Sequence, residues 1–90
     1  MNYSEALQIQ LTWDNGDIIE GRDLTLWRRD AFGSLIHRRR YGDHDSQYGW
    51  EIDHLQPIVL GGAESLANYR PLHWRNSAAG ALRTRLRLVR

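Results

Sequence analysis

Two short strand-like runs, separated by a segment rich in turn-forming residues, constrain this sequence more than any other feature. The first run covers residues 50–54 (WEIDH) and the second covers residues 69–72 (YRPL). The segment between them contains Pro57 and the pair Gly61-Gly62, residue types that end strands and let the chain reverse. We therefore predict two strands that fold back on each other and bring polar residues at their ends together.

The composition is that of a folded globular protein. Ninety residues suffice for one domain, although a core of that size gives only marginal stability. Hydrophobic residues make up 41% and charged residues 26%, which argues against a disordered chain. No run reaches the roughly 18 apolar residues of a membrane span, and the first ten residues do not resemble a secretory signal, so we expect a cytoplasmic protein. The absence of cysteine excludes disulfides and thiolate metal sites.

The charges are distributed unevenly along the chain. Residues 1–68 carry six Arg and eleven acidic residues, a net charge of −5, whereas residues 69–90 carry six Arg and no acidic residue, a net charge of +6. All twelve basic residues are Arg, whose planar group binds phosphate through two parallel hydrogen bonds. Codon usage explains an all-Arg composition equally well, so this feature alone does not identify a nucleic-acid partner.

The N-terminal half contains two predicted hairpins. Residues 8–13 (QIQLTW) alternate enough for a strand, and the turn-forming residues DNGD precede a second strand at 18–20. Residues 27–31 and 34–37 flank the pair Phe32-Gly33, which predicts another hairpin or a brief turn. No repeat or low-complexity tract interrupts this pattern.

Residues 38–49 are polar and contain glycines, so we predict a loop there. Apolar residues between 74 and 88 recur every three to four positions, which predicts a helix weakened at Gly80. The predicted fold class is therefore α+β. Four aromatic residues are expected in the core, with base stacking as a less favoured role for Trp74: Trp27, Trp50, Tyr69 and Trp74.

Residues 50–76, with Asp53-His54 after the first run and Asn68 before the second, resemble the HNH nuclease motif. This motif is a strand–loop–strand–helix unit that holds one divalent metal ion against a scissile phosphate. The preceding residues, RRDAFGSLIHRRRYGD and then YGWEIDH, look like the lead-in of small bacterial and phage HNH proteins. The resemblance implies one ββα-metal domain over residues 1–90: N-terminal hairpin and loop at 1–49, the motif at 50–80, and the end of a basic helix at 81–90.

The resemblance also assigns roles to three residues of the motif. His54 is implied as the general base, since a neutral imidazole can take a proton from water near neutral pH. Asp53 is implied as a metal ligand, because in the family the chain bends at this pair and turns the carboxylate toward the metal. Asn68 is implied to hydrogen-bond across the loop and fix the backbone around the base.

The third position of the motif departs from the family pattern. In the family, a His or Asn nine residues after the middle Asn supplies the second metal ligand, but nine residues after Asn68 is Ser77, and Asn76 is at eight. Adjacent helical residues point about 100° apart, so only one of them can face Asp53. We expect Asn76 to be the ligand, with the Ser77 hydroxyl as the alternative and loss of metal and catalysis as a third outcome. His73 is expected to pack or to contact phosphate.

Such oxygen ligands imply one divalent cation, Mg²⁺ or Mn²⁺, and no organic cofactor. Arg70, Arg75, Arg83 and Arg87 are candidates for contact with the DNA backbone, although Arg on an open helix face is often only solvated. The leading hypothesis is a metal-dependent HNH endonuclease that hydrolyses DNA phosphodiester bonds, of phage or mobile-element type. The alternatives are a nucleic-acid-binding module that no longer cuts, and an interaction protein on the same scaffold.

Overall fold

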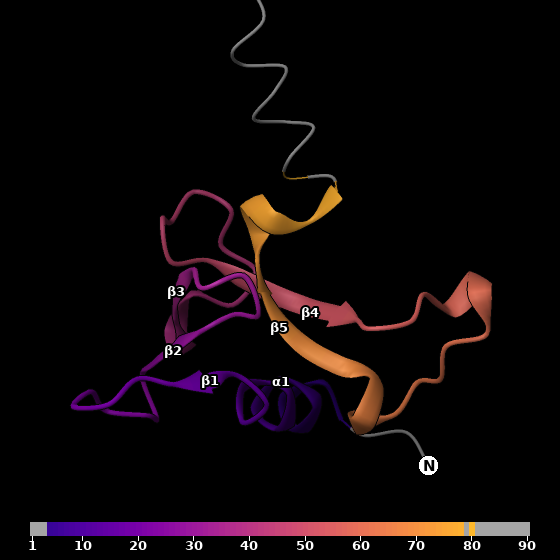
Figure 1. The fold of residues 1–90 in the computed structure, drawn as a ribbon, viewed down its shortest axis with the longest axis horizontal. Helices are drawn as coiled ribbons and strands as arrows, with labels where there is room; N and C mark the ends of the chain where they lie inside the picture. The colour runs from indigo at the N-terminus through magenta and orange to yellow at the C-terminus, as the bar shows by residue number, and fades with distance from the viewer. Residues whose placement is uncertain (1–3, 79, 81–90) are drawn as a thin grey trace, which may run out of the picture.

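One helix and two antiparallel sheets make up residues 4–78 and 80, the part of the chain that this computed structural model describes. The predicted α+β class is confirmed (Figure 1). Helix α1 (Glu5–Trp13) comes first, followed by a sheet of β1 (Asp17–Ile18), β2 (Trp27–Arg29) and β3 (Leu35–His37), and then by a sheet of β4 (Trp50–His54) and β5 (Tyr69–His73). Short 3₁₀ turns connect these elements: η1 (Arg38–Arg40), η2 (Ile58–Leu60), η3 (Leu66–Asn68) and η4 (Trp74–Asn76).

The β4–β5 pair crosses the middle of the molecule, with α1 against β5 and the β1–β3 sheet toward one end (Figure 1). The C-terminal end of β4 points away from β2 and β3, toward the loop that carries η2 (Figure 1). Within residues 4–78 and 80, no helix is both long and apolar enough to span a membrane.

The first segment differs from its prediction, because residues 8–13 belong to helix α1 and not to a strand. Ser4 caps this helix: its Oγ accepts a hydrogen bond from the backbone N–H of Leu7 at 3.2 Å, which satisfies one of the free amides at the helix start. The alternation in QIQLTW hides a helical spacing, since Ile9 and Trp13 are four residues apart and both pack into the core. Packing of that face against the core therefore favours a helix.

The predicted hairpin between residues 8–13 and 18–20 is consequently wrong. The turn-forming residues end the helix, as the Gly16 N–H donates to the Trp13 carbonyl at 2.9 Å. Strand β1 pairs with β2 and not with residues 8–13, the partner that the sequence predicted. The buried Arg28 connects β2 to the turn between α1 and β1, because its Nη1 donates to the Gly16 carbonyl at 3.0 Å.

The second predicted hairpin is confirmed, since β2 and β3 pair antiparallel across residues 30–34. Asp30 shapes the turn: its Oδ1 accepts hydrogen bonds from the backbone N–H groups of Phe32 (3.0 Å) and Ser34 (2.9 Å). Gly33 has a φ of +86°, a left-handed conformation that favours glycine. Residues 38–49 form the predicted loop, with η1 at its start and a single bridge between Tyr41 and Trp50.

The core is built around two tryptophan rings. Trp13, Ile36 and Trp50 are fully buried, and the Trp13 and Trp50 ring centroids are 5.2 Å apart. Ile9 and Tyr41 pack against this cluster. A helix, the larger sheet and the first residue of β4 thus share one apolar centre.

The predicted burial of Tyr69 and Trp74 is confirmed, as each is 3% exposed. Trp27, also predicted for the core, is only half-buried. It is the first residue of the central strand β2, and its ring contacts three polar or charged side chains: His37, Tyr48 and Arg22.

The predicted helix over residues 74–88 does not begin at residue 74, because 74–76 form the 3₁₀ turn η4 and Ser77 has an extended backbone with φ −72° and ψ 157°. The Ser77 Oγ accepts a hydrogen bond from the Gly80 N–H at 3.0 Å, the contact of a helix N-cap. Residues 81–90, for which the helix end was predicted, lie outside the described residues.

Candidate functional site

The β4–β5 ladder is regular through the Asp53-His54 pair. Asp53 lies opposite Arg70 and His54 lies opposite Tyr69, and the Leu55 N–H donates to the Asn68 carbonyl at 2.8 Å. Successive side chains of a strand face opposite sides of the sheet, so the Asp53 carboxylate and the His54 imidazole point away from each other. The bend at this pair that the family resemblance implied is not present.

Asn68 fixes the loop that follows β4. It is 9% exposed, and its side chain makes three hydrogen bonds across the loop. Its Oδ1 accepts from the Gln56 N–H at 2.8 Å, and its Nδ2 donates to the carbonyls of Gln56 and Ala63, each at 2.9 Å. The structure thus places Asn68 where it holds the loop backbone, the position implied by the resemblance.

The two glycines of this loop serve different purposes. Gly61 has a φ of +93° at the end of η2, which favours glycine for conformational reasons. At Gly62 a Cβ atom would collide with the Gln56 carbonyl, so the absence of a side chain allows two backbones to approach closely. Between Pro57 and Gly61 the apolar side chains of η2 face solvent, and Val59 is 91% exposed.

His54 lies beside a carboxylate that the sequence pattern did not indicate. Its Nε2 is buried and lies 3.0 Å from Oε1 of Glu64, at ion-pair distance although without the alignment of a hydrogen bond. The Tyr69 hydroxyl donates to Oε2 of the same carboxylate at 2.7 Å, and the Tyr69 ring meets the imidazole edge to face. The hydrogen bond from Tyr69, followed by the contact with His54, lowers the pKa of Glu64 below its ordinary value of 4.5.

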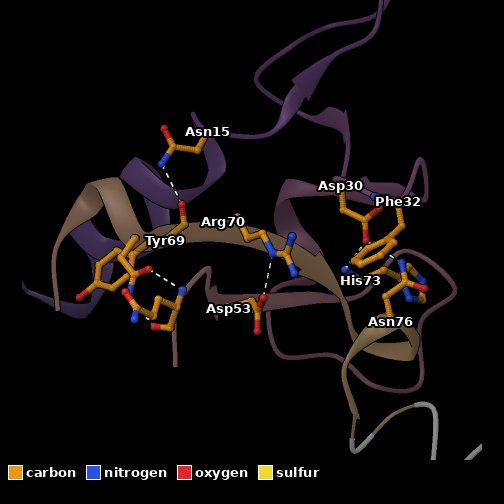
Figure 2. Close-up of polar contacts among 10 residues, drawn as sticks. Asn15, Asp30, Phe32, Asp53, Tyr69, Arg70, His73 and Asn76 are labelled. Atoms are coloured by element: carbon orange, nitrogen blue, oxygen red, sulfur yellow. Dashed lines mark hydrogen bonds and ion pairs between the residues drawn. The ribbon is translucent and has the colours of Figure 1, made fainter. Parts of the chain in front are cut away.

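On the opposite face of the sheet, Asp53 is paired with Arg70. The Arg70 Nε donates to Oδ2 of Asp53 at 2.8 Å, and the two side chains are 28% and 31% exposed (Figure 2). The Arg70 guanidinium also lies over the exposed ring of Phe32, 5.3 Å from its centroid. The carboxylate predicted as a metal ligand is therefore partly neutralised by an Arg that was predicted to bind phosphate.

Asn76 faces a different carboxylate from the one predicted. Its Nδ2 donates to Oδ2 of the buried Asp30 at 2.7 Å and to the Ser34 hydroxyl at 2.9 Å. Figure 2 shows the Asn76 side chain turned toward Asp30 and away from Asp53. The alternative ligand, Ser77, caps the backbone at Gly80.

Asp30 connects the larger sheet to the end of β5. Besides shaping its own turn, it accepts a hydrogen bond from the His73 N–H at 2.9 Å. Sequence reasoning did not assign this role, although the Asp30-to-Gly33 turn in the lead-in marks the position.

His73 is a packing residue, one of the two roles expected for it. It is 5% exposed, its Nδ1 accepts from the Arg75 N–H at 3.0 Å, and its Nε2 lies 2.7 Å from the Gln47 carbonyl. Both ring nitrogens are thus occupied by backbone groups, which leaves none for a metal.

The predicted metal ligands do not fit a cation as arranged. Asp53 binds Arg70 and Asn76 binds the buried Asp30, and among residues 4–78 and 80 no three His, Cys, Asp or Glu side chains are grouped so as to hold a metal ion. No catalytic step through a metal is therefore derived from this geometry.

Of the remaining predicted DNA contacts, Arg75 is exposed with its guanidinium 4.9 Å from the Trp74 ring centroid, while Arg83 and Arg87 lie outside the described part of the chain.

No protein-family model matches this sequence, and no curated protein and no solved structure matches it either.

Proposed function

We propose that this chain is a DNA endonuclease of the HNH type in which His54 is the general base. The observation that carries the proposal is the unit formed by β4, its loop and β5. His54 ends the first strand, Asn68 holds the loop through three hydrogen bonds, and the loop brings Glu64 within 3.0 Å of the imidazole. A fixed imidazole backed by a carboxylate is an arrangement suited to accepting a proton from water.

The chemistry assigned to His54 follows from which ring nitrogen is accessible. Nε2 is buried beside Glu64, so Nδ1 is the nitrogen able to meet a water molecule. As the water oxygen bonds to phosphorus, one of its protons passes to Nδ1, and the bond between phosphorus and the leaving O3′ breaks with its electron pair on O3′. The Glu64 carboxylate stabilises the imidazolium that forms, and O3′ takes a proton from solvent.

DNA as the substrate is supported by the Arg side chains near the end of β5. Arg75 is exposed and, among the described residues, has no carboxylate partner. The sequence from residue 69 onward contains six Arg and no acidic residue, a net positive charge that favours a polyanion. Contacts of this kind bind the phosphate backbone without reading sequence.

A second candidate function is a module of the same type that binds without cutting. The specific observation in its favour is the pairing of Asp53 with Arg70 and of Asn76 with Asp30, which leaves the two predicted metal ligands apart. The exposed apolar residues of η2 favour an interaction role as well, since contiguous exposed apolar groups mark contact surfaces.

A nicking assay with a matched control separates these two functions. Supercoiled plasmid is incubated with wild type, His54→Ala and His44→Ala, each with Mg²⁺, Mn²⁺ or EDTA. His44 is the control because its Nε2 also lies 3.0 Å from a carboxylate, that of Glu51, and because its side chain is 38% exposed against 31% for His54. We expect wild type and His44→Ala to nick equally and His54→Ala to lose about 10²- to 10⁴-fold in rate.

DNA affinity, measured by fluorescence anisotropy on the same proteins, should be nearly unchanged in His54→Ala. Binding by wild type without nicking under any of the three conditions would favour the non-cutting module. Equal nicking by both His variants would reject His54 as the base.

A further inference from the structure

A cavity of about 430 Å³ lies near the N-terminal end of β4, on the side of the larger sheet. It is lined by Trp27 of β2, His37 of β3, Arg39 and Arg40 of η1, and Tyr48. Its volume falls in the range of sites that hold small organic ligands. Four of these residues belong to the two lead-in segments at 28–43 and 48–54, for which the sequence predicted no ligand, and Trp27 directly precedes the first segment.

The aromatic part of this cavity is unusually open for this protein. Trp13, Trp50 and Trp74 are 0 to 3% exposed, whereas Trp27 is half-buried. The Trp27 ring is held edge to face by Tyr48 (centroids 5.0 Å apart) and by His37 (4.5 Å apart), and the Arg22 guanidinium lies 5.2 Å from its centroid, which leaves the other face of the indole for a base. The position of the indole is therefore defined while part of it stays accessible, which is what a stacking platform requires.

The charged part of the cavity comes from two consecutive exposed Arg residues. No acidic residue is among the cavity-lining side chains. Arg40 lies 3.8 Å from Asp43, a distance at which the pair is weak, and within residues 4–78 and 80 no ion pair engages Arg39. At least one guanidinium is thus available to an anion.

His37 joins the aromatic and charged parts. Its Nδ1 accepts a hydrogen bond from the Arg39 N–H at 3.1 Å, so the neutral ring carries its proton on Nε2. Burial, and then the charges of Arg39 and Arg40, lower the pKa of His37 below its ordinary value of 6.5. Near neutral pH this side chain can therefore contribute an N–H donor to the same ligand.

The cavity is separate from the proposed catalytic residue. The His37 carbonyl accepts a hydrogen bond from the Trp50 indole at 2.9 Å, which places it at the first residue of β4, whereas His54 is the last. Four residues of strand separate these positions by roughly 13 Å.

We propose that this cavity binds a nucleotide, with the base stacked on Trp27 and its edge toward Tyr48, and with the phosphate bound by Arg39 and Arg40. Aromatic rings beside Arg fit a base and its phosphate together, since every base has a stacking face and a guanidinium binds phosphate oxygens in pairs. The ligand is either a free nucleotide or one residue of a single DNA strand. The proposal does not depend on cleavage by His54.

The test uses three probes: adenosine 5′-monophosphate, a fluorescein-labelled single-stranded DNA dodecamer, and inorganic phosphate. Titration calorimetry and anisotropy are carried out on wild type, Arg39→Gln and the control Arg29→Gln, which removes another exposed charge outside the cavity. We expect Arg39→Gln to weaken binding about tenfold or more and Arg29→Gln to have little effect. Binding of the monophosphate identifies a free nucleotide, and binding of the dodecamer alone identifies a DNA strand.

A spectroscopic readout tests the aromatic contact without a variant that risks misfolding. In two-dimensional NMR of the indole N–H groups, the bound probe should shift the Trp27 signal and leave those of Trp13 and Trp74, which donate to the carbonyls of Leu24 and Ser46, unchanged. Equal affinity for inorganic phosphate and for the nucleotide, an unshifted Trp27 signal, or no weakening in Arg39→Gln would each overturn the proposal. Unchanged binding in His54→Ala would show that it stands apart from the proposed nuclease activity.

Discussion

Asn68 and Gln56 form a reciprocal pair between a side chain and a main chain. The Gln56 N–H donates to the Asn68 Oδ1 at 2.8 Å, and the Asn68 Nδ2 donates to the Gln56 carbonyl at 2.9 Å. This pair extends the β4–β5 ladder beyond Leu55 by using an amide side chain in place of a backbone. Because Asn68 is 9% exposed, water cannot readily replace these bonds, and the loop that carries Glu64 depends on them.

We expect Asn68→Ala to lower the free energy of unfolding by about 2–4 kcal/mol, because it leaves buried backbone groups without partners. Urea denaturation followed by tryptophan fluorescence measures this change. Asn68→Asp keeps the acceptor for Gln56 but sets a carboxylate oxygen against the Gln56 and Ala63 carbonyls, so its loss should be at least as large. A loss below about 0.5 kcal/mol in the Ala variant would show that the loop does not depend on Asn68.

The acid–base behaviour of Glu64 is expected to depend on Tyr69. The pKa of Glu64 in the folded protein is below its ordinary value of 4.5. The contacts of the ionised carboxylate with Tyr69 and His54 therefore stabilise the fold fully at pH values above 4.5. This contribution is lost as the pH falls below 4.5 and through the folded pKa. Tyr69→Phe removes the largest cause and should raise the pKa toward 4.5. An NMR titration of the Glu64 carboxyl carbon measures it, with Tyr41→Phe as the control that should leave it unchanged.

Binding of Mn²⁺ at Asp53 remains a prediction from the family resemblance, and it should compete with the Arg70 ion pair. Because Arg70 holds this carboxylate, titration calorimetry should detect at most weak Mn²⁺ binding in wild type, and Asp53→Asn should abolish it. Arg70→Gln frees the carboxylate and should strengthen binding about two- to fivefold, the range expected from breaking a half-exposed ion pair. If Asp53→Asn binds Mn²⁺ as tightly as wild type, the cation does not use this carboxylate.

Replacing Asn76 and replacing Ser77 should change the free energy of unfolding by different amounts, and neither replacement should change the affinity for a cation. Asn76→Ala removes the donor to the buried Asp30 carboxylate, so we expect a loss of about 1.5–3 kcal/mol in the free energy of unfolding. Ser77→Ala removes only a cap and should cost about 1 kcal/mol. Chemical denaturation and Mn²⁺ titration of both variants measure these effects, and a large drop in Mn²⁺ affinity in Asn76→Ala alone would restore it as a ligand.

Local sequence patterns predicted the elements whose conformation depends on residues close together in sequence. The β2–β3 and β4–β5 pairs were identified because turn-forming residues separate them and because each run is short. Helix α1 was not, because QIQLTW satisfies both a strand period and a helix period over so few residues. Ser4 and the burial of Trp13 decide between the two, and burial is a property of the folded chain.

The sequence by itself determined the α+β class and the position of His54 at the end of a strand. Both follow from the chain's own order, since strand ends and turns depend on residues close together in sequence, whereas the place of Asn68 across its loop was implied by the family resemblance. Only the tertiary structure decided which charged groups meet. Asn76 bonds to Asp30 from 46 positions away in sequence, and Arg70 bonds to Asp53 from 17 positions away. Hydrogen bonds and ion pairs depend on ångström-scale distances, and residue order alone does not specify those distances.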